Sequence, residues 1–265
     1  LHKNTSIYYI FENEPWERAL MISLNYYNKS KNSFAFTHTL ISKNNYNYSN
    51  ISELQNLNAF PCNIIFTGRY NLKNFLDISK IDLKKDNIKF FFTNSNKLNK
   101  SISFNRYRNK KILFLIDDVI YIEKLYQIMI NLFMNNNFEI LYSFNIHDKK
   151  IINAIKKYNF SMFKKLNFFS QNYIDTYFVV YNSTSLSLEF YKAGYKLAYY
   201  DFYENKDYDP LSNIEYNKYT FRSYEDLLFL TKKEYKQIDR IKLYKGFLKY
   251  FGNNSNFKLK EIKDI

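Results

Sequence analysis

The chain has 265 residues, of which 46% are hydrophobic and 20% aromatic, so it can bury a sizeable core in one large domain or in one and a half ordinary ones. Its single cysteine, Cys62, excludes an internal disulfide framework and a zinc site built from several thiolates. The net charge of +14 would suit a polyanionic partner, but the lysines are scattered and accompany the Asn, Ile, Tyr and Phe bias of an AT-rich genome. We therefore expect no nucleic acid as a partner, whereas peripheral association with an anionic membrane stays open.

The amino-terminal sequence gives two expectations about the whole protein. No stretch approaches the ~20 apolar residues of a membrane span, and residues 1–5 do not resemble the start of a signal peptide, so we expect a cytoplasmic location, with the inner face of the cytoplasmic membrane as one alternative. The first residue is Leu1 rather than methionine, which indicates a piece of a longer chain.

Short apolar runs rich in β-forming residues alternate with longer amphipathic segments, the order typical of βα units that build a parallel sheet. The predicted strands cover residues 6–11, 33–37, 63–67, 111–116, 138–143, 176–181 and 196–201. The predicted helices cover residues 16–28, 120–135, 149–158, 186–192, 224–230 and 233–250. On the first helix, Trp16, Leu20 and Leu24 recur at helical spacing, which predicts a buried Trp16. Asn-rich patches, including 44–50, are expected to be loops.

Pro61 marks the best internal boundary, because a fresh strand follows it and an Asn-rich stretch precedes it. We therefore expect residues 1–60 to belong to one α/β domain and residues 61–265 to form a second, Rossmann-like domain.

The most informative segment is a strand that enters a helix through Asn182, Ser183, Thr184 and Ser185. Free backbone N–H groups and hydroxyls at a helix start bind phosphate well, and the carboxyl edge of a parallel sheet is where ligands collect. The same residues also suit an ordinary helix N-cap, because Ser and Thr are favoured there for their own sake. On spacing alone, the N-cap interpretation is favoured.

The run from Asn182 through Glu189 to Gly194, followed by a strand at 196–200, resembles the donor-binding element of GT-B glycosyltransferases that build capsules, teichoic acids and Kdo-containing glycans. A second match, Glu12-Asn13-Glu14-Pro15-Trp16-Glu17 followed by Thr37-His38-Thr39, resembles the ENxPWE…QHS pattern of bacterial surface-carbohydrate biosynthesis proteins. The segment from Pro61 to Gly68 is similar to the strand and glycine turn that open the C-terminal domain of that family.

The resemblance fails after the strand at 138–143. Related transferases usually have a Lys-Pro-His-Pro-like turn at this place, whereas this chain runs Phe144-Asn145-Ile146-His147-Asp148. His147 is therefore either a donor-site residue or an exposed loop histidine. Asp117-Asp118 could be interpreted as a metal-binding pair, but Asp also suits the N-cap that a βα loop needs at this point, and we favour that role.

The resemblance implies the C-terminal domain of a GT-B glycosyltransferase plus the end of its N-terminal domain, with a cleft between the two. It implies a nucleotide-sugar donor, a glycan or lipid-linked acceptor, and no metal or other cofactor. The implied donor-binding residues are Gly68, His147, Asn182, Ser183, Thr184, Ser185 and Glu189, with Glu189 at a ribose hydroxyl. The candidates for the catalytic base are Glu12, Glu14 and His38, although the true base could lie upstream of this sequence. Two other functions remain: a non-catalytic Rossmann-like binding or scaffold domain, favoured by the missing prolines, and a basic nucleic-acid-binding domain.

Overall fold

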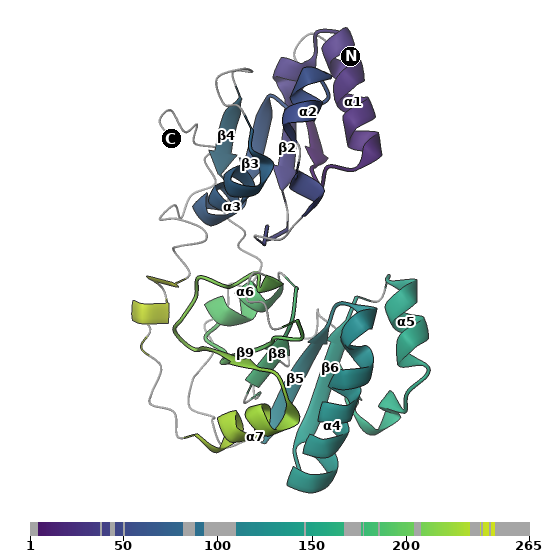
Figure 1. The fold of residues 1–265 in the computed structure, drawn as a ribbon, viewed down its shortest axis with the longest axis vertical. Coiled ribbons are helices and arrows are strands. Elements are labelled where there is room, and N and C mark those ends of the chain that lie inside the picture. The colour runs from purple at the N-terminus through teal and green to yellow at the C-terminus, as the bar shows by residue number, and fades with distance from the viewer. Residues whose placement is uncertain are drawn as a thin grey trace. The chain divides into compact units, whose positions relative to one another are not determined.

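The computed structural model shows an α/β protein whose strands are all paired in parallel in the described part of the chain (Figure 1). It describes residues 5–37, 39–42, 46–49, 51–81, 88–92, 110–145, 147–166, 176, 178–184, 186–203, 208–233, 239, 241–243, 245 and 246. The chain divides into two compact units, Leu1–Asn96 with Leu248–Ile265, and Lys97–Phe247. Within the described ranges, no helix has both the length and the apolar character needed to cross a bilayer.

The first unit contains a four-stranded sheet in the order β1-β2-β3-β4. Its strands are β1 (Ile7–Ile10), β2 (Ser33–Thr37), β3 (Asn63–Phe66) and β4 (Lys89–Phe92). Its helices are α1 (Pro15–Tyr26), α2 (Ile51–Asn56) and α3 (Arg69–Ser79). Aromatic side chains fill the core, where Phe75 packs against Phe11, Tyr48 and Phe66 with ring centroids 5.2–6.5 Å apart.

This arrangement corrects the domain boundary expected at Pro61. The strand after Pro61 is β3, which pairs with β2 through Ala35, Phe36 and Thr37 and is buried along its whole length. In the sequence, a strand that is covered on both faces is a continuous apolar run, and such a run does not indicate which of two sheets the strand joins. Pro61 therefore precedes an inner strand of the first sheet, and the chain divides only after residue 96.

The second unit contains a six-stranded sheet in the order β10-β9-β8-β5-β6-β7. Its strands are β5 (Lys111–Ile116), β6 (Glu139–Phe144), β7 (Lys164–Lys165), β8 (Phe178–Tyr181), β9 (Leu197–Tyr200) and β10 (Lys218–Phe221). Its helices are α4 (Ile122–Asn136), α5 (Lys149–Ile155), α6 (Leu186–Lys192) and α7 (Tyr224–Lys232). The strands β4, β7 and β10 and the helices α2 and α3 were not predicted, and the helix predicted over 233–250 lies largely outside the described residues.

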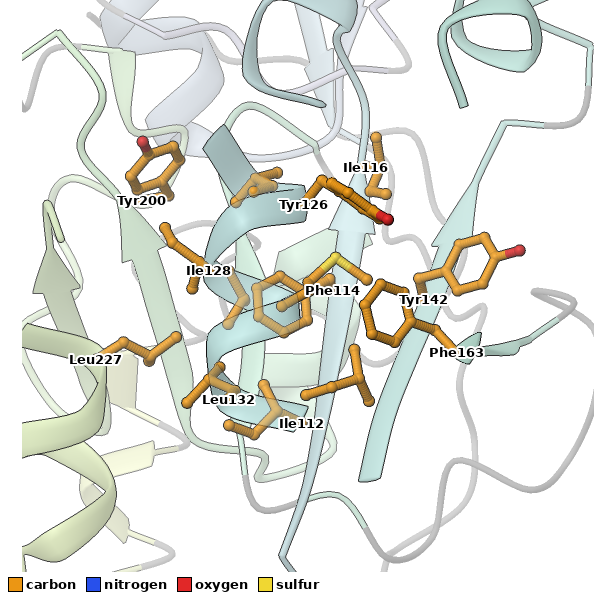
Figure 2. Packing of buried hydrophobic residues seen from close by; sticks show 14 of the residues in the cluster. Ile112, Phe114, Ile116, Tyr126, Ile128, Leu132, Tyr142, Phe163, Tyr200 and Leu227 are labelled. Carbon is orange, nitrogen blue, oxygen red and sulfur yellow. The ribbon is translucent and has the colours of Figure 1, made fainter. Parts of the chain in front are cut away.

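The core of the second unit lies between its sheet and α4. Alternate side chains of a strand point to opposite faces, so Ile112, Phe114 and Ile116 of β5 all point to one face. Figure 2 shows these residues packed against Ile128 and Leu132 of α4, and all five belong to one buried cluster. The cluster holds the central strands in register and so fixes where their carboxyl ends lie.

Trp16 is not buried as predicted, because its side chain is 55% exposed. The buried residues of α1 are Glu17, Met21 and Leu24. Glu17, Met21 and Leu24 are also spaced at helical intervals, so the sequence spacing alone fits this stripe as well, although it includes the polar Glu17. Hydrogen bonds to the Glu17 carboxylate offset the free-energy cost of burying it. With Glu17 inside, Trp16 lies at the border of the core, where its ring meets the Tyr9 ring edge-on with the centroids 6.4 Å apart.

Asparagine takes the left-handed backbone positions that glycine usually occupies. Among the described residues other than glycine, φ is positive at Asn13, Asn28, Asn58, Lys80, Asn137 and Asn217. Asn137 shows the usual use, because it ends α4 and its N–H group donates to the carbonyl oxygen of Leu132.

Candidate functional site

The candidate site lies where the connections of two neighbouring strands diverge. After β5 the chain continues through α4 to β6 on one side, whereas after β8 it continues through α6 to β9 on the other. Because β5 and β8 are adjacent and parallel, their carboxyl ends form a topological switch point, the place where open α/β sheets bind ligands. Asp117 follows β5, and Asn182, Ser183 and Thr184 follow β8.

Asp117 and Ser183 are joined across this switch point. The backbone N–H group and the hydroxyl of Ser183 both donate to Oδ2 of Asp117, at 2.8 and 2.7 Å. The two donors that Ser183 contributes to the predicted phosphate site are thus already bound to a carboxylate of the same chain. An incoming phosphate would have to replace Asp117 as their acceptor.

The second carboxylate oxygen of Asp117, Oδ1, is buried and has no hydrogen-bond partner. Burial raises the pKa of Asp117 to about 6, while the hydrogen bonds from Ser183 oppose the shift and the nearby Asp118 adds to it. The carboxyl group therefore changes its charge close to neutral pH. Perturbed carboxyl groups at ligand-binding edges are typical of functional sites, although ion-pair networks also produce them.

The rest of the turn caps α6. Oγ1 of Thr184 accepts from the N–H group of Leu186 at 3.3 Å, and the carbonyl oxygen of Thr184 accepts from the Ser187 hydroxyl at 2.7 Å. Asn182 is buried, and its amide donates to the carbonyl oxygen of Tyr200 on β9 at 2.6 Å. Its Oδ1 is a second buried oxygen without a partner at this edge. Thr184 thus binds the start of α6, while Ser183 binds Asp117.

The structure brings only some of the predicted donor-site residues together. Glu189 is buried on α6, while Ser185 lies outside the described residues. His147 is exposed in the turn after β6, where its backbone N–H group donates to Oδ1 of Asn145 at 3.0 Å. Gly68 precedes α3 in the first unit rather than belonging to the sheet that carries Ser183.

Two of the three predicted catalytic residues, Glu12 and Glu14, lie at the carboxyl end of β1. The N–H group of Glu12 donates to both carboxylate oxygens of Glu17, each at 3.0 Å, and the N–H group of Glu14 donates to Oε2 at 3.1 Å. Burial raises the pKa of Glu17, whereas these backbone hydrogen bonds lower it. Glu14 is the exposed N-cap of α1, and His38 lies outside the described residues.

Asn13 and Arg18 complete this turn. Nε and Nη2 of Arg18 donate to Oδ1 and the carbonyl oxygen of Asn13, at 3.2 and 2.9 Å, and Asn13 has φ of 63°. The Glu-Asn-Glu-Pro-Trp-Glu segment therefore holds together the connection between β1 and α1. Its side chains mainly fix a turn, and Glu12 and Glu14 lie in the connection that follows β1.

The sequence interpretation missed one charged pair at the same edge as Asp117. Nε and Nη2 of Arg222, after β10, donate to Oδ2 of Asp201, after β9, at 3.1 and 3.0 Å. Asp201 is buried, and its Oδ1 has no partner. The position of each residue directly after an apolar strand was the signal available in the sequence, because parallel strands end at one edge.

A metal site at Asp117-Asp118 finds no support in the positions of these side chains. Oδ1 of Asp118 accepts from the N–H group of Ile120 at 3.1 Å, so Asp118 has the N-cap role that we favoured. Among the residues that the structure describes, no three His, Cys, Asp or Glu side chains lie close enough together to hold an ion.

The chain is similar to two solved structures at low sequence identity. No protein-family model matches the chain, and no curated protein matches it. The crystal structure of TarM is similar with a TM-score of 0.46 and 13% identity, over 84% of this chain and 46% of the TarM chain. The crystal structure of MurG from Acinetobacter baumannii is similar with a TM-score of 0.39 and 11% identity, over 89% of this chain and 75% of the MurG chain. At these identities the likeness concerns the α/β fold, and the aligned region spans about half the length of TarM.

Proposed function

We propose that this protein is the nucleotide-sugar-binding part of a GT-B glycosyltransferase, which moves a sugar from an activated donor to a surface polysaccharide or lipid-linked glycan. The observation that carries the proposal is the Asp117–Ser183 pair at the switch point of a six-stranded parallel sheet. The segment that resembles a glycosyltransferase donor element, Asn182 to Gly194, begins at this same turn. Fold and sequence resemblance thus point to one place on the chain.

In this proposal the phosphate of the donor binds at Ser183, Thr184 and Ser185, with Glu189 at a ribose hydroxyl and His147 as a further donor contact. The phosphate replaces the Asp117 carboxylate as acceptor of the Ser183 hydrogen bonds. Two anions do not share these donors favourably, so protonation of Asp117 helps the exchange. Because the pKa of Asp117 is raised to about 6, this protonation requires little free energy near neutral pH.

Sugar transfer also needs a base that takes the proton of the acceptor hydroxyl and a site that stabilises the leaving phosphate. Glu12, Glu14 and His38 are the candidates for the base, and Glu12 and Glu14 follow β1 at the edge where parallel sheets bind ligands. The reaction proceeds without a metal ion in this proposal, and the basic chain associates with the anionic face of a membrane, where its acceptor is found.

Calorimetry with cytidine and uridine nucleotides tests the donor site. The Ser183→Ala/Thr184→Ala variant is expected to lose on the order of tenfold to several-hundredfold in affinity, because charge-assisted hydrogen bonds to phosphate are lost. Asp117→Asn keeps the shape of the side chain but removes its charge, so it is expected to bind the same nucleotide more tightly above pH 6. The proposal is wrong if no nucleotide binds the parent protein, or if neither variant changes the affinity.

A non-catalytic binding domain is the second candidate. Two observations favour it: Glu14 stands at the N-cap of α1, and His147 is exposed in a turn without the family's prolines. Release of free nucleotide from a nucleotide-sugar in the presence of acceptor distinguishes the candidates. Binding without release would support the second.

A further inference from the structure

An aromatic cluster stands beside the Asp117–Ser183 pair. We call it the edge aromatic cluster, and it consists of Tyr121, Phe202, Tyr203 and Tyr208. Tyr121 follows β5, and Phe202 and Tyr203 follow β9, so the cluster lies at the carboxyl edge of the second sheet. Its ring centroids are 5.2 Å apart for Tyr121–Phe202, 4.9 Å for Phe202–Tyr203 and 5.2 Å for Tyr203–Tyr208.

The cluster runs from the core to the surface. Tyr121 is buried, whereas Tyr203 is 45% exposed, and the neighbouring Val119 and Ile120 are 37% and 53% exposed. Single exposed apolar residues are common, but three of them beside one ligand-binding edge form an uncovered apolar rim. The contacts of Tyr203 with Tyr121 and Phe202 are both edge-to-face, which holds the exposed ring in a fixed orientation.

The cluster is also coupled to the polar pair at the switch point. The rings of Tyr121 and Tyr203 pack edge-to-face at 6.1 Å, and the charges of Tyr203, Asp118 and Asp117 add to the burial that raises the pKa of Tyr121. Nζ of Lys124 lies 4.5 Å from the centre of the Phe202 ring. Tyr203 thus packs against a tyrosine that is influenced by two carboxylates and against a phenylalanine that lies under a cation, an environment that suits a planar, polar ring system.

We propose that Tyr203 binds the base of a nucleotide by stacking, with Val119 and Ile120 as the apolar rim of the same subsite. The inference rests on the proposed function, because it assigns the base of the donor whose phosphate binds at Ser183. A ring that is already held in place loses little conformational freedom when it binds, so most of its stacking energy contributes to affinity.

Calorimetry with cytidine monophosphate, uridine monophosphate and inorganic phosphate tests the subsite. Tyr203→Ala is expected to weaken binding of both nucleotides about five- to hundredfold, the factor that corresponds to about 1–3 kcal/mol of base stacking. Tyr203→Phe keeps the ring and is expected to bind within about twofold of the parent protein. The binding of inorganic phosphate is expected to be the same in all three proteins.

Phe229→Ala is the matched control, because Phe229 is an exposed aromatic residue of the second unit on α7. Its nucleotide affinity is expected to equal that of the parent protein. If Tyr203→Ala binds nucleotide like the parent protein, the base subsite is wrong and the donor site at Ser183 stands. If the parent protein binds no nucleotide at all, the proposed function fails together with the subsite.

Discussion

Asp117 accepts two hydrogen bonds from Ser183, a residue 66 positions away in the sequence, and both reach the same carboxylate oxygen. The pair ties the ends of β5 and β8 together at the point where their connections diverge. It also leaves Oδ1 of Asp117 buried without a partner, so the carboxyl group is held in place at a cost to its charged form.

The first prediction concerns the pH dependence of this pair. The pKa of Asp117 is raised to about 6 in the folded protein, so the folded state keeps this proton at pH values where the unfolded chain has lost it. The contribution of Asp117 to stability therefore falls as the pH rises from about 4 to about 6. We expect Asp117→Asn to be more stable than the parent protein above pH 6, by up to about 3 kcal/mol, and to lose this advantage towards pH 4.

Thermal unfolding of both proteins at several pH values between about 4 and 8 checks this. Asp148→Asn is a suitable control, because Asp148 is a carboxylate at an N-cap whose Oδ1 accepts from the N–H groups of Lys150 and Ile151. Its stability difference should not follow the Asp117 profile. A constant difference between parent and Asp117→Asn across the range would contradict the prediction.

The second prediction concerns Glu17. Glu17→Ala leaves the N–H groups of Glu12 and Glu14 without their acceptor, and we expect the free energy of unfolding to fall by about 1–3 kcal/mol. Glu123→Ala, an exposed carboxylate in the first turn of α4, should cost at most about 1 kcal/mol. Urea denaturation of both variants measures the difference, and equal costs would show that the buried carboxylate does not organise the turn.

The third prediction follows from the exposure of Trp16. Because the side chain is 55% exposed, we expect Trp16→Ala to change stability by no more than about 0.5–1 kcal/mol. Leu24→Ala, on the buried stripe of the same helix, should cost about 2–5 kcal/mol. Thermal unfolding of the two variants shows which face of α1 is buried. A larger loss of stability for Trp16→Ala than for Leu24→Ala would mean that the Trp16 face is buried, as expected from the sequence.

The fourth prediction compares two ion pairs of the second unit. Asp209 is buried, pairs with Lys218 and accepts from the Tyr181 hydroxyl at 2.9 Å. Lys218→Met leaves this carboxylate unpaired and should cost about 3–5 kcal/mol. Lys111→Met removes the Lys111–Glu139 pair, whose side chains are 32% and 42% exposed, and should cost about 0–1 kcal/mol. Similar losses in chemical denaturation would show that Lys218 and Asp209 are not coupled.

The sequence predicts the elements whose apolar pattern is strong. The strands at 33–37 and 111–116 have the expected bounds, because the first alternates buried with partly exposed residues and the second is an almost entirely buried apolar run. The helix α3 was missed because two of its buried positions are asparagines. Asn71 donates to Thr67 and to the carbonyl oxygen of Thr39, and Asn74 donates to the carbonyl oxygen of Ile41. Hydrogen bonds to distant segments make this burial favourable, and no local pattern reveals them.

The candidate site was predictable in part. The turn after β8 was identified from its hydroxyl-rich residues, and Asp118 from its suitability as an N-cap. The partner of Ser183 was not, because it depends on β5 lying beside β8, and strand order is a property of the whole sheet. Arg222 and Asp201 were missed for another reason: β10, the strand that Arg222 follows, was not predicted.

The asparagines at left-handed positions limit the conformational freedom of the turns in which they lie. The chain has four glycines in 265 residues, and most of the described left-handed positions are taken by asparagine. Asparagine has a Cβ atom and therefore a narrower range of backbone angles than glycine. Exchanging Asn28 or Asn58 for glycine would keep the native geometry but would widen the range of conformations open to the unfolded chain. Each such exchange would therefore lower the free energy of unfolding without changing a contact of the core, so these asparagines stabilise the fold through the conformations that they deny to the unfolded chain.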